Sequence, residues 1–176
     1  MDDAIILIRS PFDAILANFN RLMGIAHTKK SQNKIDHHTG RATMEDFESE
    51  SWLRSSKQIG RADRWLRLYE GNLKTRKTLP IFYEDLKADP VPEMKKIGFF
   101  LGCLAFPAND QDAFDCMFGD DSTKFKRNST SDFDPWSLVS HETIERINAK
   151  ITQLNETLYQ KHGLTLPSTY MRDLQN

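Results

Sequence analysis

The chain has 176 residues, a length at which a single domain with one core is typical. Its 24 basic and 25 acidic side chains leave a formal net charge of -1, which argues against a bulk electrostatic binder of nucleic acid. The only cysteines, Cys103 and Cys116, are too few for a disulfide scaffold and do not suit a zinc site, which usually needs four ligands.

An apolar strand is predicted near the amino terminus. Residues 4–8 are apolar at every position, as in a parallel strand that is buried on both faces. Such a strand needs neighbours on both sides, and only one other segment has a comparable pattern. We therefore expect the sequence to be part of a longer domain. No apolar stretch reaches the roughly 18 residues that would cross a bilayer.

A helix is predicted directly after this strand, over residues 11–22. Ser10 is suited to the N-cap and Pro11 to the first helical position. The apolar stripe of the helix is formed by Ile15, Phe19 and Leu22. The polar residues 27–41 are predicted to form a loop, and strand, turn and helix together are typical of an α/β fold.

The middle of the chain predicts a long amphipathic helix and a second strand. The helix covers residues 43–70, with Gly60 as a weak point, and Trp52 and Trp65 are expected in the core. The second strand covers residues 78–83. A further helix over residues 91–101 is expected to end at Gly102, a frequent helix C-cap residue.

The last third predicts a short helix, a loop and a final helix. The short helix covers residues 106–117, the loop 119–139, and the final helix 141–162, which Gly163 is expected to stop. The order of elements predicts an α/β class, with an incomplete parallel sheet flanked by helices and a helix-rich composition.

Two side chains follow the two predicted strands, where ligands bind in open α/β sheets. Arg9 precedes a helix, so its guanidinium and the helix N–H groups could converge on one anion, although an ion pair with Asp13 is the alternative. Tyr83 could stack on a base or bond a phosphate, although packing is the simpler role for an aromatic residue there.

The other polar clusters carry less information by themselves. Lys124, Lys126 and Arg127 form a basic cluster on the predicted loop. The alternative to a binding role is that these charges are simply exposed to solvent. The adjacent His37 and His38 are poorly placed to share one metal ion, and no metal site is expected. The sequence contains neither a Gly-x-x-x-x-Gly-Lys nor a Gly-x-Gly-x-x-Gly phosphate loop.

Two stretches resemble the sulfotransferase family, which transfers a sulfuryl group from 3′-phosphoadenosine 5′-phosphosulfate. Residues 6–14 (ILIRSPFDA) are similar to the family's strand followed by Arg-x-Pro-x-Asp. Residues 81–90 (IFYEDLKADP), with 94–97 and 99–102, resemble its Tyr-Glu-Asp-Leu stretch and the helix after it. The resemblance implies that residues 1–176 are the carboxyl-terminal portion of one domain with a P-loop-like fold.

Within that family, residues 18–21 and 163–170 are most similar to the WSC-domain-containing, sialate O-sulfotransferase-like proteins. These are Golgi membrane enzymes proposed to sulfate sialic acid on glycans, so the resemblance implies a glycan acceptor and a Golgi location. The acidic amino-terminal end carries no targeting signal of its own. Two N-glycosylation sequons, at Asn128 and Asn155, would matter only in a lumenal protein.

The resemblance also implies roles for individual residues. Arg9 matches the arginine at the donor's 3′-phosphate, Tyr83 a tyrosine at the adenosine, and Lys126 with Arg127 a basic loop over the 3′-phosphate, with Lys124 nearby. The chain departs from cytosolic members at Ala17, where those proteins have a phosphate-binding serine.

The largest departure from the family is the phosphosulfate loop, which has no counterpart in this sequence. The general base usually lies in the missing part too, so the catalytic residues are unknown and the chain as written is expected to be inactive. Three alternatives stay open. One is a non-catalytic relative that binds an adenine nucleotide or a protein, and another is a helical interaction module. The third is a P-loop kinase relative, which would also need the missing loop.

Overall fold

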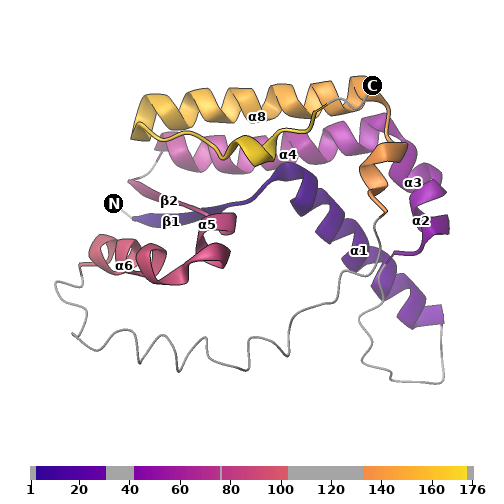
Figure 1. The fold of residues 1–176 in the computed structure, drawn as a ribbon, viewed down its shortest axis with the longest axis horizontal. Coiled ribbons are helices and arrows are strands. Elements are labelled where there is room, and N and C mark those ends of the chain that lie inside the picture. The colour runs from indigo at the N-terminus through magenta and orange to yellow at the C-terminus, as the bar shows by residue number, and fades with distance from the viewer. Residues whose placement is uncertain (1–2, 31–41, 76, 103–132, 174–176) are drawn as a thin grey trace. The chain divides into compact units, whose positions relative to one another are not determined.

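The computed structural model describes residues 3–30, 42–75, 77–102 and 133–173. The chain divides into two compact units, one of residues 1–8 with 76–134 and the other of residues 9–75 with 135–176. Most described residues are helical, and a small parallel sheet of two strands accompanies them, consistent with the α/β class (Figure 1). The predicted short helix at 106–117, both cysteines and His37 with His38 lie outside the described residues.

The first unit contains the two strands. β1 (Ala4–Ile8) and β2 (Thr78–Phe82) pair in parallel, with Ile6 opposite Pro80 and Ile8 opposite Phe82. The parallel pairing confirms the prediction, but burial of β1 on both faces is wrong. Ile6 and Ile8 are 8% and 0% exposed, whereas Ile5 and Leu7 are 39% and 45% exposed. Side chains alternate along a strand, and the described residues cover only one face of β1.

Two helices follow β2 in the same unit. The strand ends one residue earlier than predicted, and Tyr83 is the first residue of α5 (Tyr83–Ala88). Asp89 then caps α6 (Pro90–Phe100) by accepting a 3.3 Å hydrogen bond from the Val91 N–H. Gly102 follows with a φ of 84°, the left-handed conformation expected of a C-cap glycine.

The second unit begins with α1 (Pro11–Lys30), which is eight residues longer than the predicted 11–22. Residues 23–30 contain only one poor helix former, Gly24, so little in them opposes continuation of the helix. The Ala14 N–H donates to the Ser10 carbonyl at 2.9 Å. Ser10 therefore occupies the N-cap position and Pro11 the first helical position, as predicted.

The single long helix predicted over 43–70 is wrong. The segment forms α2 (Met44–Glu48), α3 (Glu50–Leu53) and α4 (Ser55–Thr75). Ser49 and Arg54 separate these helices with extended ψ angles of 152° and 108°. The Ser49 hydroxyl donates to the Asp46 carbonyl at 2.5 Å, and such local side-chain bonds compete with the helical backbone pattern.

Trp52 lies in the centre of the core of this unit, as predicted, and is fully buried. Its ring centroid is 4.8 Å from that of Phe19, 5.0 Å from that of Phe47 and 4.9 Å from that of Trp136. Its indole N–H donates to the Pro135 carbonyl at 2.9 Å, in the short 3-10 turn η2 (Pro135–Leu138). The core is therefore built from segments that are far apart in the sequence.

The final helix, α8 (His141–His162), has the predicted bounds, and Gly163 ends it with a φ of 66°. α8 packs along α4 (Figure 1), and its buried positions are Thr143, Ile144, Ile147, Ile151, Leu154 and Leu158.

A carboxyl-terminal strap, residues 164–173, follows α8 and contains the short turn η3 (Ser168–Tyr170). Asn148 of α8 binds the backbone of Arg172 in both directions, donating to its carbonyl at 2.8 Å and accepting from its N–H at 3.2 Å. Tyr170 is 1% exposed, so the strap contributes a large side chain to the core. Across the described ranges, no helix has the length and apolar character of a membrane span.

Candidate functional site

Arg9 lies at the junction of the strand and the first long helix. It follows the last residue of β1 and begins the second unit, two residues before α1. The Trp65 indole N–H of α4 donates to the Arg9 carbonyl at 2.9 Å, and Trp65 is itself buried. The backbone of the junction is thus fixed by a contact between residues 56 positions apart.

The surroundings of Arg9 suit an anion. The first N–H groups of an α-helix have no partner within the helix, and the helix dipole makes this end electropositive. Ala14 is the first residue of α1 that donates back, to Ser10, so the N–H groups of Phe12 and Asp13 precede that bond. Arg9 is half-buried, and Ser10 beside it is 5% exposed. A guanidinium, a hydroxyl and helix N–H groups are the donors that a phosphate accepts.

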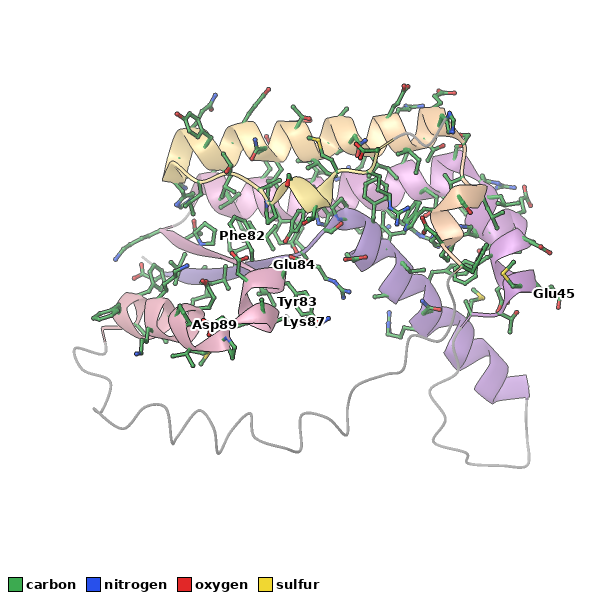
Figure 2. The ribbon with its side chains drawn as sticks, viewed as in Figure 1. Glu45, Phe82, Tyr83, Glu84, Lys87 and Asp89 are labelled. Atoms are coloured by element: carbon green, nitrogen blue, oxygen red, sulfur yellow. The ribbon has the colours of Figure 1, made fainter. Side chains whose placement is uncertain are left out.

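Tyr83 lies in the first unit, at the start of α5, with Phe82 before it (Figure 2). It is half-buried. The next two residues are Glu84 and Asp85, so the first turn of this short helix carries two carboxyl groups. These groups disfavour a phosphate close to Tyr83, and contact with an uncharged ring is the interaction that its phenol can offer.

Arg9 and Tyr83 each follow one strand of the parallel pair, and the register of the strands is what links their positions. Ile8 is opposite Phe82, so β1 and β2 end at the same level, and Arg9 and Tyr83 are the residues that follow. Lys124, Lys126 and Arg127, the other predicted binding residues, lie outside the described residues. The assignment of all five residues to one ligand stays a prediction.

Of the two sequons, Asn128 lies outside the described residues and Asn155 lies within α8. The Asn155 Oδ1 accepts a 2.7 Å hydrogen bond from the Leu166 N–H of the strap. The hydroxyl of Thr157, the third sequon residue, donates to the Gln153 carbonyl at 3.3 Å. Both sequon side chains are half-buried and engaged in the fold, which disfavours modification at Asn155 once the chain has folded.

The sequence analysis missed a group of basic residues on α4. Lys57, Arg61, Arg64 and Arg67 recur every three or four positions, and this helical spacing was the available signal. Burial of Arg61, together with the positive charge of Arg64 beside it, lowers the pKa of Arg61 from its usual value. No group of three or more metal-ligating side chains occurs in the part of the chain that the structure describes.

Comparison with known proteins gives a distant relative whose name includes a family. No family model matches the chain, and no solved structure matches it. A WSCD family member of Aedes aegypti is 25% identical over 148 residues. The match indicates a WSCD-like relationship. It covers 84% of this chain but only 43% of that relative, so the chain spans less than half of the relative's length.

Proposed function

We propose that this chain is the nucleotide-holding part of a sulfotransferase domain. The domain transfers a sulfuryl group from 3′-phosphoadenosine 5′-phosphosulfate to a glycan hydroxyl, with sialic acid as a possible acceptor, in the Golgi. The proposal treats the fold as an incomplete P-loop-like sheet. The WSCD-like match and the two family-like sequence stretches support it.

The observation that carries the proposal is the junction at Arg9. A strand, an arginine, a buried serine and the start of a 20-residue helix follow one another without a loop. Trp65 holds the backbone at this point. The donor's 3′-phosphate would accept hydrogen bonds from the Arg9 guanidinium and from the first turn of α1.

The remaining predicted residues would complete the nucleotide site. Tyr83 would contact the adenine, because the acidic first turn of α5 favours an uncharged ring over a phosphate. Lys124, Lys126 and Arg127 would close over the 3′-phosphate and add positive charge. These residues bind and orient the donor. Stabilisation of the moving sulfuryl group needs positioned donors at that group, which none of the five residues is proposed to supply.

Calorimetric titration of the chain with 3′-phosphoadenosine 5′-phosphate tests the proposal. We expect binding in the wild type and at least a tenfold loss of affinity in Arg9→Ala, since a bidentate charge-assisted contact is removed. Arg21→Ala is the matched control. Arg21 lies on the same helix, is exposed, and within the described residues donates only to Asn18 of its own turn.

Two results would count against the proposal, one on nucleotide binding and one on sulfuryl transfer. A folded wild-type chain that gives no heat, or equal loss in Arg9→Ala and Arg21→Ala, would contradict the proposal. A longer form of the protein that binds the nucleotide but transfers no sulfuryl group to a glycan would favour a non-catalytic, nucleotide-binding relative.

A further inference from the structure

The outward face of α4 carries positive charge along most of its length. Its exposed charged residues are all basic, namely Lys57, Arg64, Arg67 and Lys74, and the half-buried Arg61 lies between the first two. From Lys57 to Arg67 the cations occur on successive turns, over about 15 Å of helix.

The two acidic residues of α4 lie at the edge of this face that is next to α8. Asp63 pairs with Lys150 of α8 at 2.9 Å. Glu70 accepts hydrogen bonds from Gln153 and Thr157 of α8, both at 3.4 Å. Glu70 also pairs with Lys74 at 2.5 Å.

The other exposed cations of the face take no part in these pairs. Among the described residues, Lys57, Arg64 and Arg67 form no ion pair. Arg61 lies over the Phe19 ring at 5.7 Å and donates to Gln58 at 3.0 Å. Like charges are therefore held close together on this face, and an anionic ligand would reduce their repulsion.

Two glycines lie on the same outward face. Gly60 and Gly71 are exposed, and a Cβ built on either one would meet no atom within 4 Å. Both lie inside a helix, where glycine is a poor helix former, and there is room for a side chain at either position. Bare backbone beside the cations lets a ligand approach the helix surface closely.

We propose that the face formed by Lys57, Gly60, Arg61, Arg64, Arg67 and Gly71, the α4 face, binds an acidic oligosaccharide with carboxylate or sulfate groups on successive sugars. The choice of a glycan rests on the proposed function, in which a glycan is the acceptor. The cations would pair with the acidic groups, and the glycines would lie under the sugar rings.

The composition of the α4 face argues against nucleic acid. Four cations are fewer than the 6–10 phosphate contacts of typical DNA-binding proteins. The face contains no aromatic residue on which the bases of a single strand could stack. The chain as a whole also has a net charge of -1.

Binding of an α2,8-linked tetramer of sialic acid to the full chain tests this inference. We expect Arg64→Glu combined with Arg67→Glu to lower the affinity at least tenfold and to weaken its dependence on salt. Lys95→Glu with Arg146→Glu changes the net charge equally on α6 and α8, and it is expected to retain near wild-type affinity. A neutral oligosaccharide of the same length should not bind.

The glycine variants provide a second, independent readout. Gly60→Ala and Gly71→Ala are expected to raise the midpoint of thermal unfolding and to lower the affinity for the sialic acid tetramer. Loss of affinity in a more stable variant cannot result from unfolding. Unchanged affinity in both the glycine and the arginine variants would overturn the inference, as would tighter binding of a DNA duplex through the same arginines.

The nucleotide experiment separates this inference from the proposed function. Arg64→Glu with Arg67→Glu is expected to bind 3′-phosphoadenosine 5′-phosphate as the wild type does, and Arg9→Ala to bind the glycan as the wild type does. Glycan binding at the α4 face without nucleotide binding at Arg9 would refute the proposed function and leave this inference standing.

Discussion

The two units of the chain bury their apolar side chains to very different extents. Among its described residues, the helical unit fully buries large side chains from several segments, among them Trp52, Phe19, Leu154 and Tyr170. In the described part of the sheet unit, residues 3–8, 77–102 and 133–134, only Ile8 and Ile81 reach that degree of burial, and Ile5, Leu7, Phe99 and Leu101 are exposed.

This difference separates stability from the predicted binding positions. Buried apolar area is the main favourable term in folding, so the described residues of the helical unit should contribute more to the free energy of unfolding than those of the sheet unit. An isolated pair of strands is marginal by comparison. Arg9 is anchored to the helical unit through Trp65, whereas Tyr83 belongs to the sheet unit. The two predicted binding residues therefore depend on regions of unequal stability.

The largest effect is expected from Trp52→Ala. It removes a fully buried ring with three aromatic neighbours and a hydrogen bond to Pro135, and should lower the free energy of unfolding by about 3–5 kcal/mol. Urea unfolding followed by far-UV circular dichroism measures the change. Leu53→Ala, at the exposed next residue, is the control. Equal effects of the two substitutions would contradict the central place given to Trp52.

A smaller loss is expected from Asn148→Ala, which removes the contact of α8 with the Arg172 end of the strap. It removes both hydrogen bonds to the Arg172 backbone and should cost about 1–3 kcal/mol. Hydrogen exchange should show faster exchange of the Arg172 N–H than in the wild type. Thr152→Ala on the same helix loses an exposed hydroxyl that donates to the Asn148 carbonyl and not to the strap, so it should leave that rate unchanged. Protection of Arg172 that survives in Asn148→Ala would disprove the role of this side chain.

The contrast between the units also shows where sequence patterns are informative. The bounds of α8 could be predicted because its period, its Ser140 cap and its Gly163 stop are all local signals. The break at Ser49 was missed although residues 48–51 are all polar and interrupt the apolar spacing between Phe47 and Trp52. The Ser49 hydroxyl bond to the Asp46 carbonyl adds a local contact there that the residue pattern does not show. Burial of Trp52 and Trp65 followed from residue type alone.

In the candidate site too, some features follow from neighbouring residues and others depend on distant ones. The position of Arg9 after a strand and before a helix is encoded by neighbouring residues. The contact that fixes its backbone comes from Trp65, and no local pattern predicts a pairing across 56 positions. The charge of α4 was visible as spaced basic residues, but the turning of Asp63 and Glu70 toward α8 depends on partners such as Lys150 and Gln153.

A pH-dependent effect is expected at Glu70. The hydrogen bond from Lys74 holds the pKa of Glu70 below its usual 4.5, with smaller contributions from the Lys74 charge, Gln153 and Thr157, against partial desolvation. A carboxyl whose pKa is lower in the folded chain stabilises it above pH 4.5, and this contribution is lost as the pH falls through the folded-state pKa. The helical unit therefore contains one defined source of acid sensitivity.

Comparison of Glu70→Gln with the wild type between pH 3 and pH 7 measures that contribution. The variant should be less stable at pH 7, and the difference should shrink toward pH 3. Glu142→Gln, at an exposed glutamate near the start of α8, should show a smaller change. A difference between Glu70→Gln and the wild type that stays constant across this range would exclude a shifted pKa at Glu70.

The smallest effect is expected on the exposed face of β1. Ile5→Thr with Leu7→Thr replaces two apolar side chains that are 39% and 45% exposed, and threonine is well suited to a strand. The free energy of unfolding should change by no more than about 1 kcal/mol, whereas Ile8→Ala on the buried face should cost about 2–5 kcal/mol. Urea unfolding of both variants tests this. A large loss in the double threonine variant would show that this face of β1 is covered in the folded chain, and the contrast between the two units would then narrow.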